Sequence, residues 1–238
     1  MSAHNELKPA KIDLLSPHLD DAAFSSWHQV EKLGSRVLTI FTGIPDDPTP
    51  SKWDLSTGFN SSHDVMSARI RENERALAVA STEAVNLDFL EREYRDTQPS
   101  IAEIADRIES VSSHDALLIA AAGIGKYGRS HVDHVITRQV GRELLARGRN
   151  VSFFVDIPYM LPVMRMSHWP ERLQIEEIER ELDLDIEIEP VELTEDEQRR
   201  KQEASRTYET QFARTNRAAF GALSRNNAYR WEALIHPK

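Results

Sequence analysis

Two short segments of this sequence carry the residues that are best suited to chemistry. The first is Ser16–Asp21 (SPHLDD) and the second is His131–His134 (HVDH). His18 and Asp21 are three residues apart, as are the two histidines of the second segment, so one helical turn directs each pair toward a single point. Imidazole and carboxylate groups that share a point suit Zn²⁺ and similar divalent ions. Both segments therefore predict metal ligands.

The elements around the first segment place it at an edge of a sheet. Lys11–Ser16 is predicted to be a buried strand, and 20–33 is predicted to be a helix. In an open α/β sheet, ligands bind at this carboxyl end of a strand. Asp20 would then stand beside the metal without binding it, which is where a general base belongs. The alternative is that Asp20 or Asp21 caps the helix and that His18 is incidental.

The second segment has a similar setting. The nearly all-apolar run Asp115–Ala122 predicts a central parallel strand, and a helix is expected from His131 to about Arg147. A surface cap is the alternative interpretation of two histidines with this spacing. Both segments lie at the carboxyl ends of predicted strands, so together they supply His18, Asp21 and one histidine of the second segment. Three protein ligands with open positions for water describe a catalytic rather than a structural zinc site.

The remaining periodicity predicts alternating strands and helices. Further strands are expected at 36–42, 84–89, 151–157, 183–193 (an edge strand) and 229–235, and further helices at 64–81, 101–111, 172–182 and from a capping box at 194–197 onward. Strand–helix–strand units of this kind are right-handed crossovers. The sequence thus predicts an α/β fold with a Rossmann-like, doubly wound and mostly parallel sheet. Helices would cover both faces, and the active site would lie at the carboxyl ends of the strands. Residues 1–238 are expected to form one domain.

Three other features concern ligand binding. The polar segment Ile44–His63 is expected to be a long loop that can cover the site, and Trp53 within it either stacks on a substrate ring or holds the loop to the body. Arg69 and Glu72 form an i, i+3 pair, which is either a solvated ion pair or a means of directing Arg69 toward a substrate oxygen. The glycines of Gly123–Gly128 fit neither dinucleotide nor P-loop spacing, so a nucleotide site is not expected.

Composition narrows the class of partner. The net charge is −10, with 29 basic and 39 acidic residues and no basic tract, which argues against nucleic acid or an anionic membrane. There are no cysteines, so a metal must be held by His, Asp or Glu. Met1–Ala10 is polar and unlike a signal peptide, and no apolar run approaches the ~18 residues of a membrane span. A cytoplasmic protein with a small-molecule substrate is expected, and its oligomeric state is unknown.

These motifs resemble the paired signatures of the PIG-L/LmbE family of zinc-dependent N-deacetylases, which act on N-acetylglucosamine units. The usual first motif of that family is His-Pro-Asp-Asp-Glu, whereas this sequence has Leu19 in place of the Pro and Ala22 in place of the Glu. Weaker resemblances are Thr42-Gly43, Arg69-x-x-Glu72, Asp156-x-Pro158-Tyr159, and Lys201 followed by Tyr208-x-x-Gln211. The resemblance therefore spans about residues 11–211.

The resemblance implies a metal-binding set and a base. His18, Asp21 and His134 would hold Zn²⁺, or another divalent ion such as Fe²⁺, since a His₂Asp set accepts several metals. Asp20 would be the general base for a metal-activated water. Ala22 has no assigned role in this chemistry, so the loss of the usual Glu is not expected to abolish turnover.

The resemblance also implies roles around the reacting amide. His131 would stabilise the oxyanion or protonate the leaving amine, and Asp133 would orient His131. Arg69 matches a position that contacts substrate. Tyr159, which follows the predicted strand 151–157, is a candidate wall of the site or else a buried structural residue.

The expected activity is removal of the N-acetyl group from an N-acetylglucosamine-type amino sugar or its conjugate. One alternative is a non-catalytic metal- or ligand-binding protein of the same fold, which is motivated by Leu19 and Ala22. Another is an amidase that acts on a non-sugar N-acyl substrate. The particular substrate and the native metal are not readable from the sequence.

Overall fold

The structure is a computed structural model that describes residues 11–125, 130–160, 168–219 and 221–238. Its strands are β1 (Ile12–Ser16), β2 (Ser35–Thr39), β3 (Glu83–Asn86), β4 (Leu117–Ala121), β5 (Val151–Phe154), β6 (Ile186–Glu192) and β7 (Trp231–Pro237). Its helices are α1 (Asp21–Ser25), α2 (Trp27–Val30), α3 (Lys52–Ser56), α4 (Ser62–Ala78), α5 (Ile101–Val111), α6 (Val132–Ala146), α8 (Ile175–Leu182), α9 (Glu195–Arg206), α10 (Phe212–Ala218) and α11 (Asn226–Arg230). Short 3-10 helices are η1 (Arg92–Tyr94), η3 (Ile157–Tyr159), η4 (Trp169–Arg172) and η5 (Ala222–Ser224).

All of these strands form one sheet in the order β3-β2-β1-β4-β5-β7-β6. The pairs from β3 through β5 are parallel, whereas β7 pairs antiparallel with both β5 and β6. In the middle of the sheet, Leu14 of β1 lies between Val37 of β2 and Ile119 of β4, and all three side chains are buried. The chain runs outward from β1 to β3 and then returns to β4. The switch between β1 and β4 is where doubly wound sheets bind ligands. The predicted α/β fold is confirmed.

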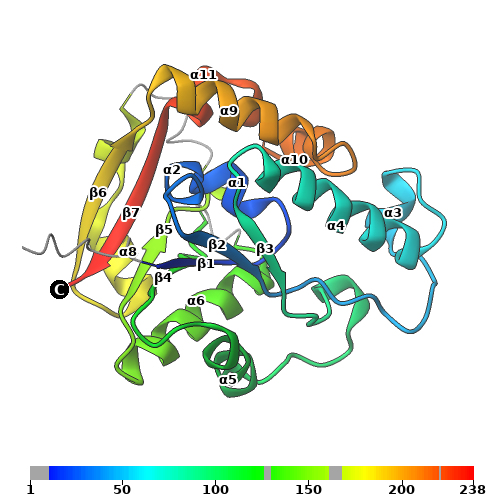
Figure 1. Cartoon of the computed structure of the whole chain (residues 1–238), viewed down its shortest axis with the longest axis horizontal. Helices are drawn as coiled ribbons and strands as arrows, with labels where there is room; N and C mark the ends of the chain where they lie inside the picture. Colours follow the sequence, from blue (N-terminus) through cyan, green and yellow to red (C-terminus); the bar gives the residue numbers. More distant parts are fainter. Residues whose placement is uncertain (1–10, 126–129, 161–167, 220) are drawn as a thin grey trace, which may run out of the picture.

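Helices cover both faces of the sheet (Figure 1). α5 and α6 lie on one face, where α6 packs on β4 and β5. α1, α2, α4 and α9 lie on the other face, where α9 contacts α1, α2 and α4. The apolar helix face predicted for 101–111 is confirmed, because Ile104, Ala105 and Ile108 of α5 are fully buried. Together these helices fix the loops at the carboxyl edge of the sheet.

The helix predicted over 20–33 is instead two short helices, α1 and α2, that meet at Ser26. The backbone N–H groups of Trp27 and His28 donate to the carboxylate of Glu232 at 2.7 and 3.0 Å. A carboxylate at a helix N-terminus satisfies free N–H groups and favours a new helix start. Because Glu232 lies in β7, 205 residues after Trp27, no local signal in 20–33 predicts the break.

One other expectation is corrected. The segment 44–63 is not a loop throughout, because it contains α3, which a capping box starts. Ser51 Oγ accepts from the Asp54 N–H at 3.1 Å, and the Asp54 carboxylate accepts from the Ser51 N–H at 2.8 Å. The edge strand expected at 183–193 is confirmed as β6. The strand predicted at 229–235 is also present, as β7, which inserts between β5 and β6.

The structure does not describe Met1–Ala10 or part of Gly123–Gly128. The expectations for these residues are therefore untested. Within the described ranges, none of the helices has the length and apolar character that crossing a membrane requires.

Candidate metal centre

The first sequence segment forms a tight turn between β1 and α1 at the carboxyl edge of the sheet. Ser16 shapes this turn, because its Oγ donates to the carbonyl of His18 at 2.6 Å and accepts from the N–H of Ala22 at 3.1 Å. The hydroxyl of Tyr208, which is fully buried, donates to the carbonyl of Leu19 at 3.0 Å. The turn is therefore held both by its own serine and by the C-terminal part of the chain.

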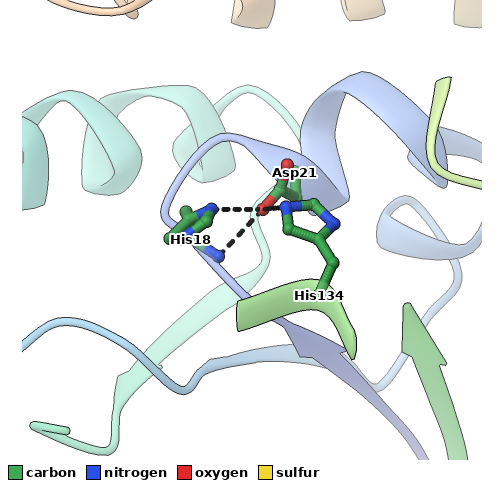
Figure 2. A group of neighbouring side chains, drawn as sticks. All are labelled: His18, Asp21 and His134. Atoms are coloured by element: carbon green, nitrogen blue, oxygen red, sulfur yellow. Dashed lines mark hydrogen bonds and ion pairs between the residues drawn. The ribbon is translucent and has the colours of Figure 1, made fainter. Parts of the chain in front are cut away.

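His18, Asp21 and His134 converge on one point, as Figure 2 shows. Oδ2 of Asp21 lies 3.2 Å from Nδ1 of His18 and 3.1 Å from Nε2 of His134. Asp21 is the first residue of α1 and His134 lies in the first turn of α6. The two helices start beside each other because they follow β1 and β4, which are neighbours in the sheet. The ligand atoms of the three side chains lie within 4.8 Å of one another.

A second carboxylate holds each imidazole from its far side. Oδ2 of Asp133 lies 3.1 Å from Nε2 of His18, and Oδ1 of Asp156 lies 2.6 Å from Nδ1 of His134. The other oxygen of Asp156 accepts from the N–H of Gly123 at 2.8 Å. Carboxylate–histidine pairs of this kind fix the ring and raise the basicity of the nitrogen that faces a metal. The arrangement leaves His18 Nδ1 and His134 Nε2 directed at Asp21.

Whether a divalent ion fits this point can be tested on His134. Its Nε2 is buried and has no hydrogen-bond partner among the described residues, although Oδ2 of Asp21 is only 3.1 Å away. With Nδ1 bonded to Asp156, Nε2 presents a lone pair to a carboxylate oxygen, and a cation between the two atoms removes the repulsion. Two imidazoles and one carboxylate suit Zn²⁺ or Fe²⁺. The residues present therefore fit a divalent ion.

A proton is the other cation that could occupy this position. Burial alone would lower the pKa of His134, but the carboxylates of Asp21 and Asp156 outweigh burial and raise the pKa to about 9. Burial would likewise raise the pKa of Asp21, but His134 and His18 hold it well below its usual range. The site is thus built to keep a positive charge between His134 and Asp21.

Asp20 lies at the N-cap position of α1, but its side chain makes no capping hydrogen bond within the described part of the chain. The Asp20 side chain therefore does not cap the helix. Asp20 is 5% exposed and lines a cavity of about 140 Å³. Burial and the charge of Asp21 raise its pKa to about 7, against the opposing charges of His18 and Arg69. A carboxylate with a pKa near neutrality is well matched to taking a proton at neutral pH.

His131 is the N-cap of α6, since its Nδ1 accepts from the N–H of Asp133 at 3.2 Å. It also lines the cavity, and its ring centroid is 4.8 Å from that of His18. Because Nδ1 accepts, Nε2 carries the proton of the neutral ring. The Asp133 carboxylate lies 3.9 Å from His131, outside hydrogen-bond reach, and instead contacts His18, the Arg95 guanidinium and the Arg92 N–H. The structure thus gives Asp133 a contact with His18 that the sequence did not predict.

Arg69 and Tyr159 both line the cavity. Arg69 is 2% exposed, and its Nη1 donates to Glu91 at 3.1 Å. The expected contact between Arg69 and Glu72 does not form among the described side chains, because Glu72 accepts from the N–H and hydroxyl of Thr210. The Tyr159 ring lies 4.7 Å from that of His134. Burial and nearby carboxylates raise the pKa of Tyr159 well above its usual value, so its hydroxyl stays protonated.

The cavity also contains residues that sequence reasoning missed. It is lined by His18, Asp20, Asp21, Trp53, Arg69, Glu91, Glu93, His131, Tyr159, Gln211 and Thr215. Of these, Glu91, Glu93 and Thr215 belong to no motif. Glu91 immediately precedes η1, Glu93 lies in η1 and Thr215 lies in α10. Gln211 belongs to the weak Tyr208-x-x-Gln211 resemblance. That resemblance drew attention to this part of the sequence but did not predict that Gln211 lines the cavity.

No protein-family model matches the sequence, and no curated protein matches it either. Solved structures do match. The A40926 pseudoaglycone deacetylase Dbv21 is 25% identical with a TM-score of 0.69, and 97% of each chain is covered. The zinc-inhibited form of teicoplanin deacetylase Orf2 is 20% identical with a TM-score of 0.70, covering 95% of this chain and 97% of that chain.

A third similar structure is the N,N'-diacetylchitobiose deacetylase from Pyrococcus horikoshii. It is 16% identical with a TM-score of 0.52, and the match covers 86% of this chain and 72% of that chain. At such identities the likeness shows a shared fold. The class that the fold and the comparisons define is an α/β protein of the architecture found in these deacetylases.

Proposed function

We propose that this chain is a metal-dependent hydrolase of the PIG-L/LmbE type that removes the N-acetyl group from an N-acetylglucosamine-type amino sugar or its conjugate. The observation that carries the proposal is the convergence of His18, Asp21 and His134 on one point, with the Asp20 carboxyl group lining the cavity beside it. The three similar structures support the reaction class, because each is a deacetylase and one is a zinc-inhibited form. The expected substrate is a small molecule.

The metal set proposed here is His18, Asp21 and His134. When bound, a divalent ion supplies a lowered pKa for water and polarises the acetyl carbonyl, which an amide needs because it is a poor electrophile. The protein contributes the fixed orientation of both imidazoles through Asp133 and Asp156. It also contributes a buried setting, in which electrostatic interactions are stronger than in water.

Asp20 is proposed to take the proton. In the metal-free protein, burial and the charge of Asp21 raise the pKa of Asp20 to about 7, and its carboxylate lines the cavity where it can accept a proton from the attacking water. As the carbonyl carbon–nitrogen bond breaks, the same proton is available to the leaving amine nitrogen. This transfer gives the neutral amine and acetic acid. The amine then takes the acidic proton of acetic acid, so the products are acetate and an ammonium group on the sugar.

His131, Tyr159 and Arg69 are proposed to act on the acetyl oxygen and the sugar. Nε2–H of His131 donates to the oxyanion as it develops, which is a type of interaction worth about 2.7–4 kcal/mol per donor. Tyr159 keeps its proton and is a second donor that lines the same cavity. Arg69, held by Glu91, offers a buried guanidinium to a substrate oxygen.

The two departures from the usual family motif concern packing. Leu19 is 1% exposed and lies in an apolar cluster with Val65 and Met66 of α4. Ala22 is 1% exposed in the interior of α1. Neither side chain lines the cavity as described, so neither change removes a group from the proposed reaction. This weakens the motive for a non-catalytic binding protein.

The proposal is tested by acetate release from a panel of N-acetylglucosamine conjugates and non-sugar N-acyl compounds. Asp20→Asn should lower kcat by about 10²–10⁴-fold with its bound metal retained. His18→Ala should lose both metal and activity, while the exposed control Glu203→Gln should resemble the wild type. An Asp20→Asn protein with full activity would remove the proposed base. Chelation that unfolds a protein active on none of the panel would favour the binding alternative.

A further inference from the structure

The cavity beside the proposed metal centre has more acidic than basic groups in its lining. Among the described residues, four carboxylates and one guanidinium line it, from Asp20, Asp21, Glu91, Glu93 and Arg69. A charged group that a cation already compensates has little effect on the charge of a ligand, whereas an uncompensated one attracts or repels it. The charge preference of the cavity therefore depends on which of these carboxylates has a cationic partner.

Arg69 does not offset the acidic excess. Its Nη1 lies 3.1 Å from the Glu91 carboxylate, and its Nη2 lies 3.7 Å from the Asp54 carboxylate. Arg69 is 2% exposed and Asp54 is 0% exposed, so water screens these charges weakly. Two carboxylates around one guanidinium leave a net negative charge. Arg69 can thus donate to a neutral oxygen, but it does not favour an anionic group.

Two other carboxylates belong to the proposed chemistry. Oδ2 of Asp21 lies 3.2 Å from His18 Nδ1 and 3.1 Å from His134 Nε2, so its charge faces the point where a divalent ion would bind. Asp20 is 5% exposed and is proposed to hold the proton of the reaction. Both charges are therefore directed toward the reacting amide and not toward the rest of the substrate.

Glu93 differs from the other carboxylates of the lining. Its side chain is 34% exposed, and its Oε1 lies 3.9 Å from Nε2 of His131, which is beyond hydrogen-bond reach. The nearby His131 ring holds the pKa of Glu93 below its usual range, so the carboxylate is charged at neutral pH. Glu93 thus presents a full negative charge to the cavity.

The backbone on both sides of Glu93 is anchored. The N–H of Arg92 donates to Oδ2 of Asp133 at 3.0 Å, and the hydroxyl of Tyr94 donates to the Asp54 carboxylate at 2.8 Å. Glu93 lies between these two contacts in η1. Its charge is therefore held beside the cavity before a ligand arrives, which is the condition for a preorganised electrostatic effect.

Two arginines near the cavity do not compensate Glu93 from within the lining. Arg92 and Arg214 are both absent from the lining as described. The guanidinium carbon of Arg214 instead lies 3.9 Å from the centroid of the Trp53 ring and connects α10 to α3. A ligand in the cavity therefore meets the Glu93 carboxylate without an adjacent guanidinium.

From these contacts we infer that Glu93 sets the charge preference of the site, and that the substrate is neutral or cationic next to its N-acetyl group. The inference rests on the proposed function for the reaction. His131 links Glu93 to the reacting point, because its ring centroid lies 4.8 Å from that of His18. Substituents on C1 and C3, the sugar carbons on either side of the N-acetylated C2, therefore come near Glu93. A carboxylate or phosphate there is repelled, whereas a neutral or amino-bearing group is not.

Two matched pairs of N-acetylglucosamine derivatives test this preference. One pair carries a carboxyethyl ether or its carboxamide on O3 of the methyl β-glycoside, and the other carries a carboxymethyl or a carbamoylmethyl group on O1. The members of a pair differ by one charge and have nearly the same shape. For calorimetry a methylsulfonyl group replaces the acetyl group, because the proposed reaction does not cleave it.

The expected result follows from Coulomb's law. Like charges about 8 Å apart, at an effective dielectric constant of about 20 and with partial screening by salt, change a Kd by about tenfold. In at least one pair, the amide should therefore bind the metal-loaded wild type about tenfold more tightly than the acid. The ratio of kcat/KM for the corresponding N-acetyl compounds should follow the binding ratio.

Variants then assign the preference to Glu93. Glu93→Gln keeps the shape of an exposed side chain and removes its charge, so the ratio of amide to acid affinity should fall to within about twofold of unity. Glu203→Gln is the matched control, because it removes one charge from a 60% exposed side chain of α9 that does not line the cavity. The control should keep the wild-type ratio.

The outcomes separate this inference from the proposed function. A ratio that Glu93→Gln leaves unchanged would assign the preference to the overall charge of −10 and overturn the role of Glu93. Equal affinity for acid and amide in both pairs would overturn the charge preference, and acetate release in the same protein would spare the hydrolase. A preference that Glu93→Gln removes, in a protein that releases no acetate, would support the inference about Glu93 and overturn the hydrolase.

Discussion

Replacing Asp133 with Asn tests how the proposed metal centre is assembled. Oδ2 of Asp133 lies 3.1 Å from Nε2 of His18, whereas the Asp133 carboxylate is 3.9 Å from His131. Its Oδ1 pairs with the Arg95 guanidinium. The contacts therefore predict that Asp133 orients His18, while the family resemblance assigns Asp133 to His131. The two assignments differ in what the substitution changes.

If Asp133 orients His18, its loss weakens metal binding. Removing the carboxylate partner of a metal-binding histidine typically costs 10–100-fold in affinity, or about 1.4–2.7 kcal/mol. Asp133→Asn keeps the shape and one acceptor oxygen, so the Kd for Zn²⁺ should rise roughly 10–100-fold. Competition with a chelator of known affinity measures the change. Asp156→Asn, which alters the matching contact on His134, should have an effect of similar size.

A metal Kd for Asp133→Asn within twofold of the wild type, together with a lowered kcat and a shifted pH profile, would refute this reasoning. Asp133 would then act through His131. Because Arg95 keeps its charge and loses a charged partner, the variant is also expected to unfold at a lower urea concentration. Circular dichroism at the assay temperature checks that the comparison is made on folded protein.

Other predictions concern charge in the interior. The folded-state pKa of His134, about 9, is raised above its ordinary value near 6.5, so its contribution to stability is complete below pH 6.5 and is lost as pH rises through 9. The metal-free protein should lose up to about 3 kcal/mol of unfolding free energy over that range, as measured by urea titration. An equal loss in the wild type and in His134→Gln would contradict the role given to His134. Lys201, 1% exposed, donates to Glu232 at 2.7 Å, so Lys201→Met should cost about 3–5 kcal/mol by leaving a buried charge. The double variant with Glu232→Gln should recover part of that loss, and calorimetric unfolding that shows no recovery would contradict the charge argument.

The parts of the site that could be predicted from sequence depend on local patterns. Apolar runs mark the strands, and the residues that follow a parallel strand lie at its carboxyl end. That rule is enough to bring His18 and Asp21 near His134 once β1 and β4 are neighbours in the sheet. The i, i+3 spacing and the absence of cysteine then indicate the ligand chemistry.

What could not be predicted depends on partners far away in the sequence. Glu232 splits the expected helix at Ser26 from 205 residues beyond Trp27, and Asp133 contacts His18 across 115 residues. Spacing alone pairs Arg69 with Glu72, but Arg69 contacts Glu91 instead. In each case the contact that forms is a tertiary one, because a buried charge needs a partner. Only the fold determines which partner lies within reach.

The central claim is that His18, Asp21 and His134 form a metal centre that hydrolyses an N-acetyl amide. Elemental analysis of the purified protein alongside acetate release from N-acetylglucosamine conjugates tests it most directly. We expect about one divalent ion per chain, loss of that ion in Asp21→Asn and His134→Gln, and acetate release that follows metal content. A folded protein that takes up no metal after reconstitution would show that these three residues do not form a metal centre.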